Sequence, residues 1–208
     1  MRAAEIREQF AAIVAEHGIR RLAFCGAHKG EEVPYLLAAG VQQVTLVEPI
    51  PHLAAKLRLR FPTVEVVQAA CSDRTGMATL HIPAKTNMAT LVGPTHGPGS
   101  TIEVPTRRLD DICPDADAAV IDVQGAEFEV LAAAPWETLR LVMVETCTID
   151  DPTLSPRYDL MVTYMRGRGF TEVASFPRDY DWVQWWAYGR RTTTGAEVRD
   201  VVFAKAAP

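Results

Sequence analysis

The chain has 208 residues, a hydrophobic fraction of 48% and a formal net charge of −5. Length and composition suit a single folded domain over residues 1–208 and exclude a chain that is disordered throughout. The acidic balance argues against a nucleic-acid partner, and the lack of a membrane-length apolar run or a signal-peptide pattern favours a cytoplasmic protein without a membrane partner.

The first part of the chain alternates between helix and strand patterns. An amphipathic helix over residues 1–18 places Ile6, Phe10 and Val14 on one face, and Gly18 ends it. The segments that follow are a strand at Arg21–Cys25, a helix over 31–39, a strand at Val44–Glu48, a helix at His52–Arg60 and a strand at Val64–Gln68. This order is typical of a parallel sheet with crossover helices.

The second part of the chain continues the same pattern. Its predicted elements are a strand at Ala118–Asp122, a helix at Gly125–Ala133, a strand at Leu139–Glu145, a helix at Pro156–Arg168, and strands at Thr171–Phe176 and Val198–Ala204. No helical pattern separates the last two strands, so we expect them to pair antiparallel. The fold class predicted is α/β, a doubly wound and mostly parallel sheet with helices on both faces and an antiparallel C-terminal strand.

Four cysteines are widely and irregularly spaced, at Cys25, Cys71, Cys113 and Cys147. No CxxC pair occurs, which argues against a zinc ribbon or a thioredoxin-type site. We therefore expect reduced, buried thiols, and no metal site is predicted.

A glycine-containing turn joins the first predicted strand to the next helix, with the sequence Gly26-Ala27-His28-Lys29-Gly30. Small residues at such a turn let the backbone approach a ligand, although the pattern is GxxxG and matches neither GxGxxG nor a P-loop. Glu48 ends the second strand, about 20 residues later, where an acid typically binds a ribose hydroxyl pair. Together these features indicate a cofactor that contains a nucleoside.

The segment Ala119–Leu131 (AVIDVQGAEFEVL) resembles the signature of FkbM-family methyltransferases, which use S-adenosylmethionine. Further motifs resemble that family in the same order over residues 20 to 205: the glycine turn, Glu48-Pro49, Ala70–Gly76, Leu109–Asp111 and Asp200–Phe203. The resemblance implies a class I, Rossmann-like fold, with S-adenosyl-L-methionine as cofactor and S-adenosyl-L-homocysteine as product. It also implies O-methylation of a hydroxyl on a small-molecule acceptor, a sugar or an intermediate of natural-product biosynthesis.

The resemblance also implies roles for individual residues. The cofactor-binding residues expected are Gly26, Ala27, His28 and Gly30 at the methionine part, Glu48 and Pro49 at the ribose, Ile50, Cys71 and Ser72 at the adenine, and Asp122 and Gln124 at a neighbouring strand end. Cys71 is equally well explained as a small core residue. The candidates for a catalytic base are Asp122, Glu145 and His96.

Simpler explanations apply to these three candidates as well. Asp122 ends an apolar strand, where a buried carboxylate is costly without a role, but it is also placed to cap the following helix. Glu145 ends the next predicted strand. His96 falls in Lys85–Ser100, a segment rich in Gly, Pro and Thr that we expect to be a mobile surface loop, so simple solvent exposure is favoured over a catalytic role. We expect acceptor-site loops at 83–101 and 177–196.

One position departs from the family pattern. Phe24 stands where the family usually has an acid, two residues before the first glycine of the turn. This departure motivates an alternative, a weak or inactive cofactor-binding or scaffold domain. A nicotinamide-dependent oxidoreductase is a further alternative, against which the missing GxGxxG counts. The aromatic segment Tyr180–Tyr188 suggests either a cap over the acceptor or the interface of a homodimer.

Overall fold

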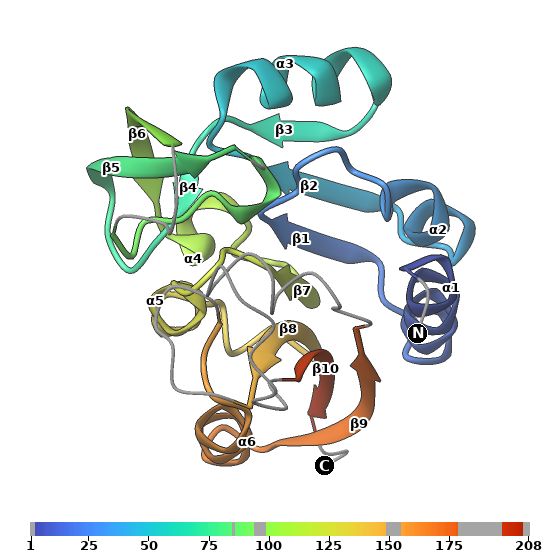
Figure 1. Cartoon of the computed structure of the whole chain (residues 1–208). Coiled ribbons are helices and arrows are strands. Elements are labelled where there is room, and N and C mark those ends of the chain that lie inside the picture. Colours follow the sequence, from blue (N-terminus) through green and yellow to red (C-terminus); the bar gives the residue numbers. More distant parts are fainter. Residues whose placement is uncertain (1–2, 85, 94–98, 149–154, 179–196, 206–208) are drawn as a thin grey trace.

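A seven-stranded sheet forms the centre of the molecule in the computed structural model, which describes residues 3–84, 86–93, 99–148, 155–178 and 197–205 (Figure 1). Its strands are β1 (Arg21–Cys25), β2 (Gln43–Val47), β3 (Glu65–Val67), β7 (Ala118–Ile121), β8 (Leu141–Cys147), β9 (Phe170–Pro177) and β10 (Val198–Lys205). They lie in the order β3-β2-β1-β7-β8-β10-β9. The first five of these are parallel neighbours, and β10 pairs antiparallel with both β8 and β9.

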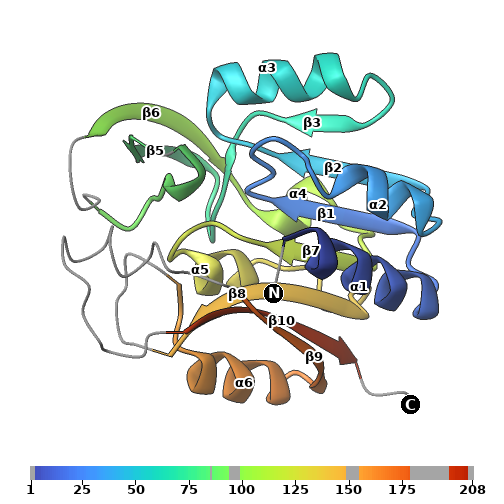
Figure 2. The same cartoon turned by 45° about the vertical axis from the view of Figure 1, so that its right-hand side comes forward.

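Helices cover both faces of this sheet (Figure 2). The helices are α1 (Ala3–Glu16), α2 (Val33–Ala38), α3 (Pro51–Arg60), α4 (Leu109–Ile112), α5 (Glu127–Ala132) and α6 (Tyr158–Arg166). Helices α1 and α2 bury Phe10, Val14 and Leu36 against one face, whereas α5 and α6 bury Leu131 and Met161 against the other. The predicted α/β fold class, with a mostly parallel sheet and an antiparallel C-terminal strand, is confirmed.

The burial of the strands explains why their sequences are almost continuously apolar. All seven residues of β8 are buried, and β1 exposes only its first residue, Arg21. Alternate side chains of β1 enter different cores, with Phe24 on the side of α1 and Cys25 on the side of α5. Parallel strands that are covered on both faces favour such runs over simple alternation.

A second, three-stranded sheet was not predicted. It consists of β4 (Ala70–Cys71), β5 (Gly76–Pro83) and β6 (Gly99–Arg107) in the order β4-β6-β5, and β5 and β6 pair antiparallel along their whole length. Residues of β5 and β6 alternate between one buried core and solvent, with Leu80 and Val104 inside. This sheet lies beside the carboxyl end of β2 (Figure 1).

Two sequence predictions need correction here. The loop predicted from Lys85 to Ser100 is shorter, because Thr86–Met88 form a 3₁₀ helix, His81 and Thr90 form a β-bridge, and β6 already begins at Gly99. Glu145 does not end its strand, because β8 continues through Cys147, where it is paired with β10. Among the described residues, no helix is both long enough and apolar enough to cross a bilayer.

Candidate active site

The carboxyl ends of β1, β2 and β7 meet at one edge of the large sheet. Because the three strands are parallel neighbours, the residues that follow them, Gly26, Glu48 and Asp122, come together there. Ligands of open α/β sheets bind at this edge. Two adjoining cavities open at it, and both are lined by Gly26, His28 and Asp122.

Gly26 is required by the closeness of two strand ends. Its φ is +82°, and a Cβ at this position would lie 1.9 Å from the backbone oxygen of Asp122. A side chain there would therefore push β7 away from β1. The turn continues through His28, which adopts a φ of +48° without being glycine. Such a conformation is uncommon for other residues and is concentrated at functional sites.

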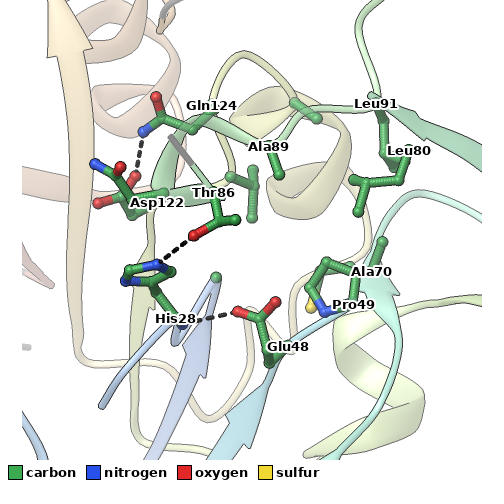
Figure 3. A pocket seen from close by; sticks show the side chains of 15 residues that line it. His28, Glu48, Pro49, Ala70, Leu80, Thr86, Ala89, Leu91, Asp122 and Gln124 are labelled. Carbon is green, nitrogen blue, oxygen red and sulfur yellow. Dashed lines mark hydrogen bonds between the residues drawn. The ribbon is translucent and has the colours of Figure 1, made fainter. Parts of the chain in front are cut away.

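Glu48 is buried at the end of β2 and fixes the turn after β1. Its carboxylate accepts a hydrogen bond from the backbone N–H of His28 at 2.8 Å (Figure 3) and another from the backbone N–H of Ile50 at 2.9 Å. Burial raises the pKa of the Glu48 carboxyl, while these two N–H groups lower it. The carboxylate lines the first cavity and has further acceptor positions directed there.

The first cavity lies between the end of β2 and the small sheet. One wall is apolar and includes Leu80, Ala89 and Leu91 from β5 and the segment that follows it, and Pro49 and Ala70 close the opposite side (Figure 3). The cavity is narrow, with a volume of about 50 Å³. A narrow apolar slot with a carboxylate at its rim suits a flat ring that carries hydroxyl groups.

The second cavity is larger, about 330 Å³, and lies on the face of the sheet that carries α1. Phe24 and Met143 contribute apolar surface to it, and Arg7, Arg178 and Asp200 contribute charge. Asn87 and Gln124, like Gly26, His28 and Asp122, line both cavities. These five residues form the junction between the two cavities.

Asp122 and Glu145 are linked through an amide. The Nε2 atom of Gln124 lies 2.5 Å from Oδ1 of Asp122 and 2.9 Å from Oε2 of Glu145. Gln124 has a φ of +57°, so it too adopts a left-handed backbone conformation. The hydroxyl of Ser155 donates to Glu145 at 2.6 Å. Glu145 is therefore behind Gln124, and Asp122 is the carboxylate of the pair that lines the cavities.

Arg178, just beyond β9, joins three carboxylates. Its guanidinium nitrogens lie 2.8 Å from Glu145, 2.5 Å from Asp200 and 3.3 Å from Asp122. Asp200 stands opposite Glu145 in the β8–β10 register, so the acids occupy neighbouring strands. The sequence prediction missed Arg178 and Asp200 as site residues. The one available signal was an acid inside the apolar strand β10.

Burial is the main cause of the raised pKa values of Glu145 and Asp200. Burial and repulsion from Asp122 raise the pKa of Glu145 to about 7, although Arg178 opposes the shift. Burial likewise raises the pKa of Asp200, again against the effect of Arg178. Burial therefore favours the protonated forms of Glu145 and Asp200 more than water would.

Glu127 has a supporting role. It is fully buried in the first turn of α5 and accepts hydrogen bonds from the backbone N–H groups of Val123 and Gly125. Burial and the nearby Glu145 raise the pKa of Glu127 well above its ordinary value. Glu127 thereby fixes the turn that carries Gln124.

The structure brings together most of the residues that the sequence singled out. The predicted site residues that line the first cavity are Gly26, His28, Glu48, Pro49, Cys71, Asp122 and Gln124. Ala27 lines the second cavity. Gly30 packs against α3, where a Cβ would lie 2.8 Å from the Phe61 ring, and Ile50 is buried in the core beneath the small sheet.

Two other predicted residues are Ser72 and His96. The hydroxyl of Ser72 donates a hydrogen bond to the carboxylate of Asp73, and Ser72 does not line either cavity. His96 lies outside the described residues, as does most of the segment 177–196. Within the part of the chain that the structure describes, no group of three or more His, Cys, Asp or Glu side chains has an arrangement suited to a metal ion.

Comparison with known proteins places this site in a family. The FkbM methyltransferase domain family matches residues 25–172. A search among curated proteins found no match. Among solved structures, an rRNA methylase from Streptococcus thermophilus aligns with a TM-score of 0.55 and 12% identity, covering 100% of this chain and 98% of that one.

Two further structures share the fold. Magnesium protoporphyrin IX methyltransferase from Synechocystis, with bound S-adenosylmethionine, aligns with a TM-score of 0.53 and 8% identity, covering 97% of this chain and 79% of that one. The 1,6-didemethyltoxoflavin-N1-methyltransferase of Burkholderia thailandensis aligns with a TM-score of 0.51 and 16% identity, covering 97% and 78%. The family match spans the glycine turn, Glu48 and Asp122, so the chain belongs to the FkbM methyltransferase family and is an S-adenosylmethionine-dependent methyltransferase.

Proposed function

We propose that this enzyme transfers the methyl group of S-adenosylmethionine to a hydroxyl group of a small molecule. The observation that carries the proposal is the junction: Glu48 faces the first cavity, and Asp122 lines both cavities where they meet. A cofactor held by its ribose at Glu48 extends past the junction toward the turn at Gly26. The second cavity is then left for the acceptor and for the amino-acid end of the cofactor.

The residues present fit such a cofactor. The narrow apolar slot beside Leu80 and Cys71 suits the adenine ring, and the Glu48 carboxylate suits a ribose hydroxyl pair. The Gly26 turn exposes backbone at the junction without a side chain in the way. When bound, the cofactor supplies an electrophilic methyl group on a sulfonium, which becomes a neutral thioether after transfer.

Asp122 and Gln124 orient the acceptor in this proposal. The Asp122 carboxylate is anchored by Gln124 and Arg178 and accepts a hydrogen bond from a donor group of the acceptor beside the reacting hydroxyl, which directs the oxygen toward the junction. The cluster behind it keeps a negative charge close to the reacting oxygen. A hydroxyl acceptor suits this arrangement, because the group must donate a proton as its oxygen attacks.

A weak or inactive cofactor-binding domain is the second candidate, and Phe24 is the observation that favours it. The Phe24 ring lines the second cavity, where the family usually provides an acid for the amino end of the cofactor. Calorimetry separates the two functions. A domain without activity binds S-adenosylhomocysteine weakly or not at all, and a Phe24→Asp variant then gains affinity.

The experiment that tests the proposal measures binding first and transfer second. Calorimetric titration with S-adenosylhomocysteine should show micromolar affinity that falls at least about tenfold in Glu48→Ala, since two charge-assisted hydrogen bonds are lost. Glu65→Ala, on the neighbouring strand β3 and away from both cavities, is the matched control. Equal affinity in Glu48→Ala and in the unaltered enzyme would contradict the ribose assignment.

Transfer is measured with S-adenosylmethionine that is labelled in its methyl group. Matched pairs of small acceptors, each pair differing only in a hydroxyl or an amine at one position, distinguish O- from N-methylation. We expect label in the hydroxyl member of a pair. Label in amines alone would overturn the choice of hydroxyl while leaving the methyltransferase itself intact.

A further inference from the structure

The geometry points to His28 as the group that takes the proton from the acceptor hydroxyl during methyl transfer. This inference rests on the proposed function and extends it, because none of the expected roles gives His28 more than contact with the cofactor. It assigns proton transfer to the glycine turn instead of to Asp122, Glu145 or His96.

Position is the first argument. The sulfur of the cofactor joins its ribose to its amino acid, so a ribose at Glu48 brings the sulfur and its methyl group to the junction. Five described residues line both cavities there, and only His28 and Asp122 among them carry an ionisable side chain. The imidazole of His28 extends over the junction opposite the Asp122 and Gln124 side chains (Figure 3).

The partners of these two residues differ. Asp122 lies 2.5 Å from the Gln124 amide and 3.3 Å from the guanidinium of Arg178. The imidazole of His28 instead contacts an uncharged group, with its Nε2 atom 3.0 Å from Oγ1 of Thr86. The arrangement suits Asp122 to orienting the acceptor molecule and His28 to accepting the proton of the reacting hydroxyl.

Thr86 contacts one of the two ring nitrogens of His28. We assign the imidazole proton to Nε2, which then donates to the Thr86 hydroxyl, and this leaves the Nδ1 lone pair for the acceptor. Thr86 belongs to the 3₁₀ helix that follows the small sheet, whereas His28 follows β1. A base whose ring is oriented by a second residue is the arrangement that general-base catalysis requires.

The backbone also holds His28 in place. Its φ of +48° is unfavourable for a residue with a Cβ, and the hydrogen bond from its N–H to Glu48 maintains that conformation. Because Glu48 is also the proposed ribose ligand, the carboxylate that binds the cofactor is the one that positions the imidazole. Cofactor binding and base position are thereby coupled through one side chain.

The surroundings keep the imidazole neutral at physiological pH. Burial and the charge of Lys29 lower the pKa of His28, and Glu31 and Asp122 oppose this, while His52 on α3 adds to the lowering. A neutral imidazole is the form that accepts a proton.

The step balances without a further reactant. The oxygen–methyl bond forms as the sulfur–methyl bond breaks, and the electron pair of the broken bond stays on sulfur. The hydroxyl proton moves to Nδ1 of His28, and the resulting imidazolium releases it to water before the next turnover. Neither an oxidant nor a metal ion enters the balance.

Nitrogen NMR of histidine-labelled enzyme tests the inference without needing the acceptor. His28→Asn identifies the His28 signals, because asparagine tolerates positive φ better than most residues and cannot take the proton. At pH 7 we expect a neutral ring with the proton on Nε2 and a titration midpoint below that of a free histidine. In Thr86→Val the preference for Nε2–H should weaken. A ring protonated on Nδ1, or an imidazolium at pH 7, would overturn the inference.

Binding and turnover complete the test. His28→Asn should bind S-adenosylhomocysteine within about threefold of the unaltered enzyme but lose about 10²-fold or more in the rate of hydroxyl methylation. The pH profile of the rate of His28→Asn should also lack the inflection on its acidic side. His17→Asn, at the end of α1, is the matched control. Failure of the unaltered enzyme to bind S-adenosylhomocysteine would contradict the proposed function, whereas full activity of His28→Asn would contradict the role of His28 alone.

Discussion

The guanidinium of Arg178 lies 2.8 Å from the buried carboxylate of Glu145, although Glu145 belongs to β8 and Arg178 follows β9, which is not adjacent to β8. Strand β10 lies between them and contributes Asp200 to the same cation. Three carboxylates thus share one guanidinium, and the pKa of Glu145 is raised to about 7 despite it. The site is therefore built from two elements at the C-terminal end of the chain as well as from the glycine turn.

Replacement of Arg178 by Met should destabilise the fold more than loss of an exposed ion pair. We expect a decrease of about 3 kcal/mol in the free energy of unfolding at pH 7.5, because the substitution leaves buried carboxylates without their cation. The control is Arg21→Met, which removes an ion pair of 3.2 Å with Asp115 in which both side chains are exposed. This substitution should lower the free energy of unfolding by less than about 1 kcal/mol. Urea unfolding measures both, and equal losses would show that Arg178 does not compensate the buried charge.

Stability should fall as the pH rises from about 5 to about 8. The pKa values of Glu48, Glu127, Glu145 and Asp200 are all raised by burial. The folded state therefore binds protons more tightly than the unfolded state, so raising the pH through this window removes stability. For Glu145 this pH window extends from the ordinary pKa of a glutamate to a pKa of about 7.

The variant Glu145→Gln checks the origin of this slope. Glutamine cannot ionise, so the melting temperature of the variant should vary less with pH than that of the unaltered enzyme. Thermal melts across the same pH range make the comparison. A melting temperature of the unaltered enzyme that rises with pH would contradict the assigned direction of these shifts.

The sequence predicted the central sheet well because its strands are short, apolar runs that end at turn residues. The predicted strand at Arg21–Cys25 coincides with β1, and the antiparallel pairing of β9 with β10 is confirmed. The positions of Glu48 and Asp122 at one sheet edge were predictable for the same reason, since each follows a strand whose direction is set by parallel pairing. Alternation between strand and helix is thus enough to predict which residues meet at one edge.

The rest of the site depends on contacts that sequence spacing does not reveal. Strands β5 and β6 are half-exposed, so their apolar residues form no continuous run, and the composition of the segment between them suggested a loop. Arg178 reaches Glu145 across β10, and no local pattern predicts which carboxylate a distant arginine contacts. Gly30 and Ile50 were assigned to the cofactor by motif, but their neighbours are core residues.

Substitution of Gly26 by Ala should disrupt the site through its geometry. A Cβ would lie 1.9 Å from the backbone oxygen of Asp122, so β1 and β7 must separate at the junction. We expect loss of detectable S-adenosylhomocysteine binding. Gly40→Ala is the control, because its φ is +93° but no atom lies within 4 Å of the added Cβ. The free energy of unfolding of this control should fall by only about 1–2 kcal/mol, which is the conformational cost of a Cβ at positive φ.

Calorimetry and urea unfolding on both glycine variants separate the two effects. If Gly26→Ala binds S-adenosylhomocysteine as the unaltered enzyme does, the close approach of the two strand ends is not needed for cofactor binding.

Substitution of Asp122 by Asn should separate orientation of the acceptor from proton transfer. Asparagine keeps the size of the side chain, so affinity for S-adenosylhomocysteine should stay within about threefold, while the rate of hydroxyl methylation should fall by about 10- to 100-fold as the charged hydrogen bond is lost. The control is Asp115→Asn, an exposed acid that precedes β7. Because the proton goes to His28, the pH profile of Asp122→Asn should keep the acid-side inflection that His28→Asn loses. Disappearance of that inflection in Asp122→Asn would instead identify Asp122 as the base, and an unchanged rate would remove it from the reacting centre.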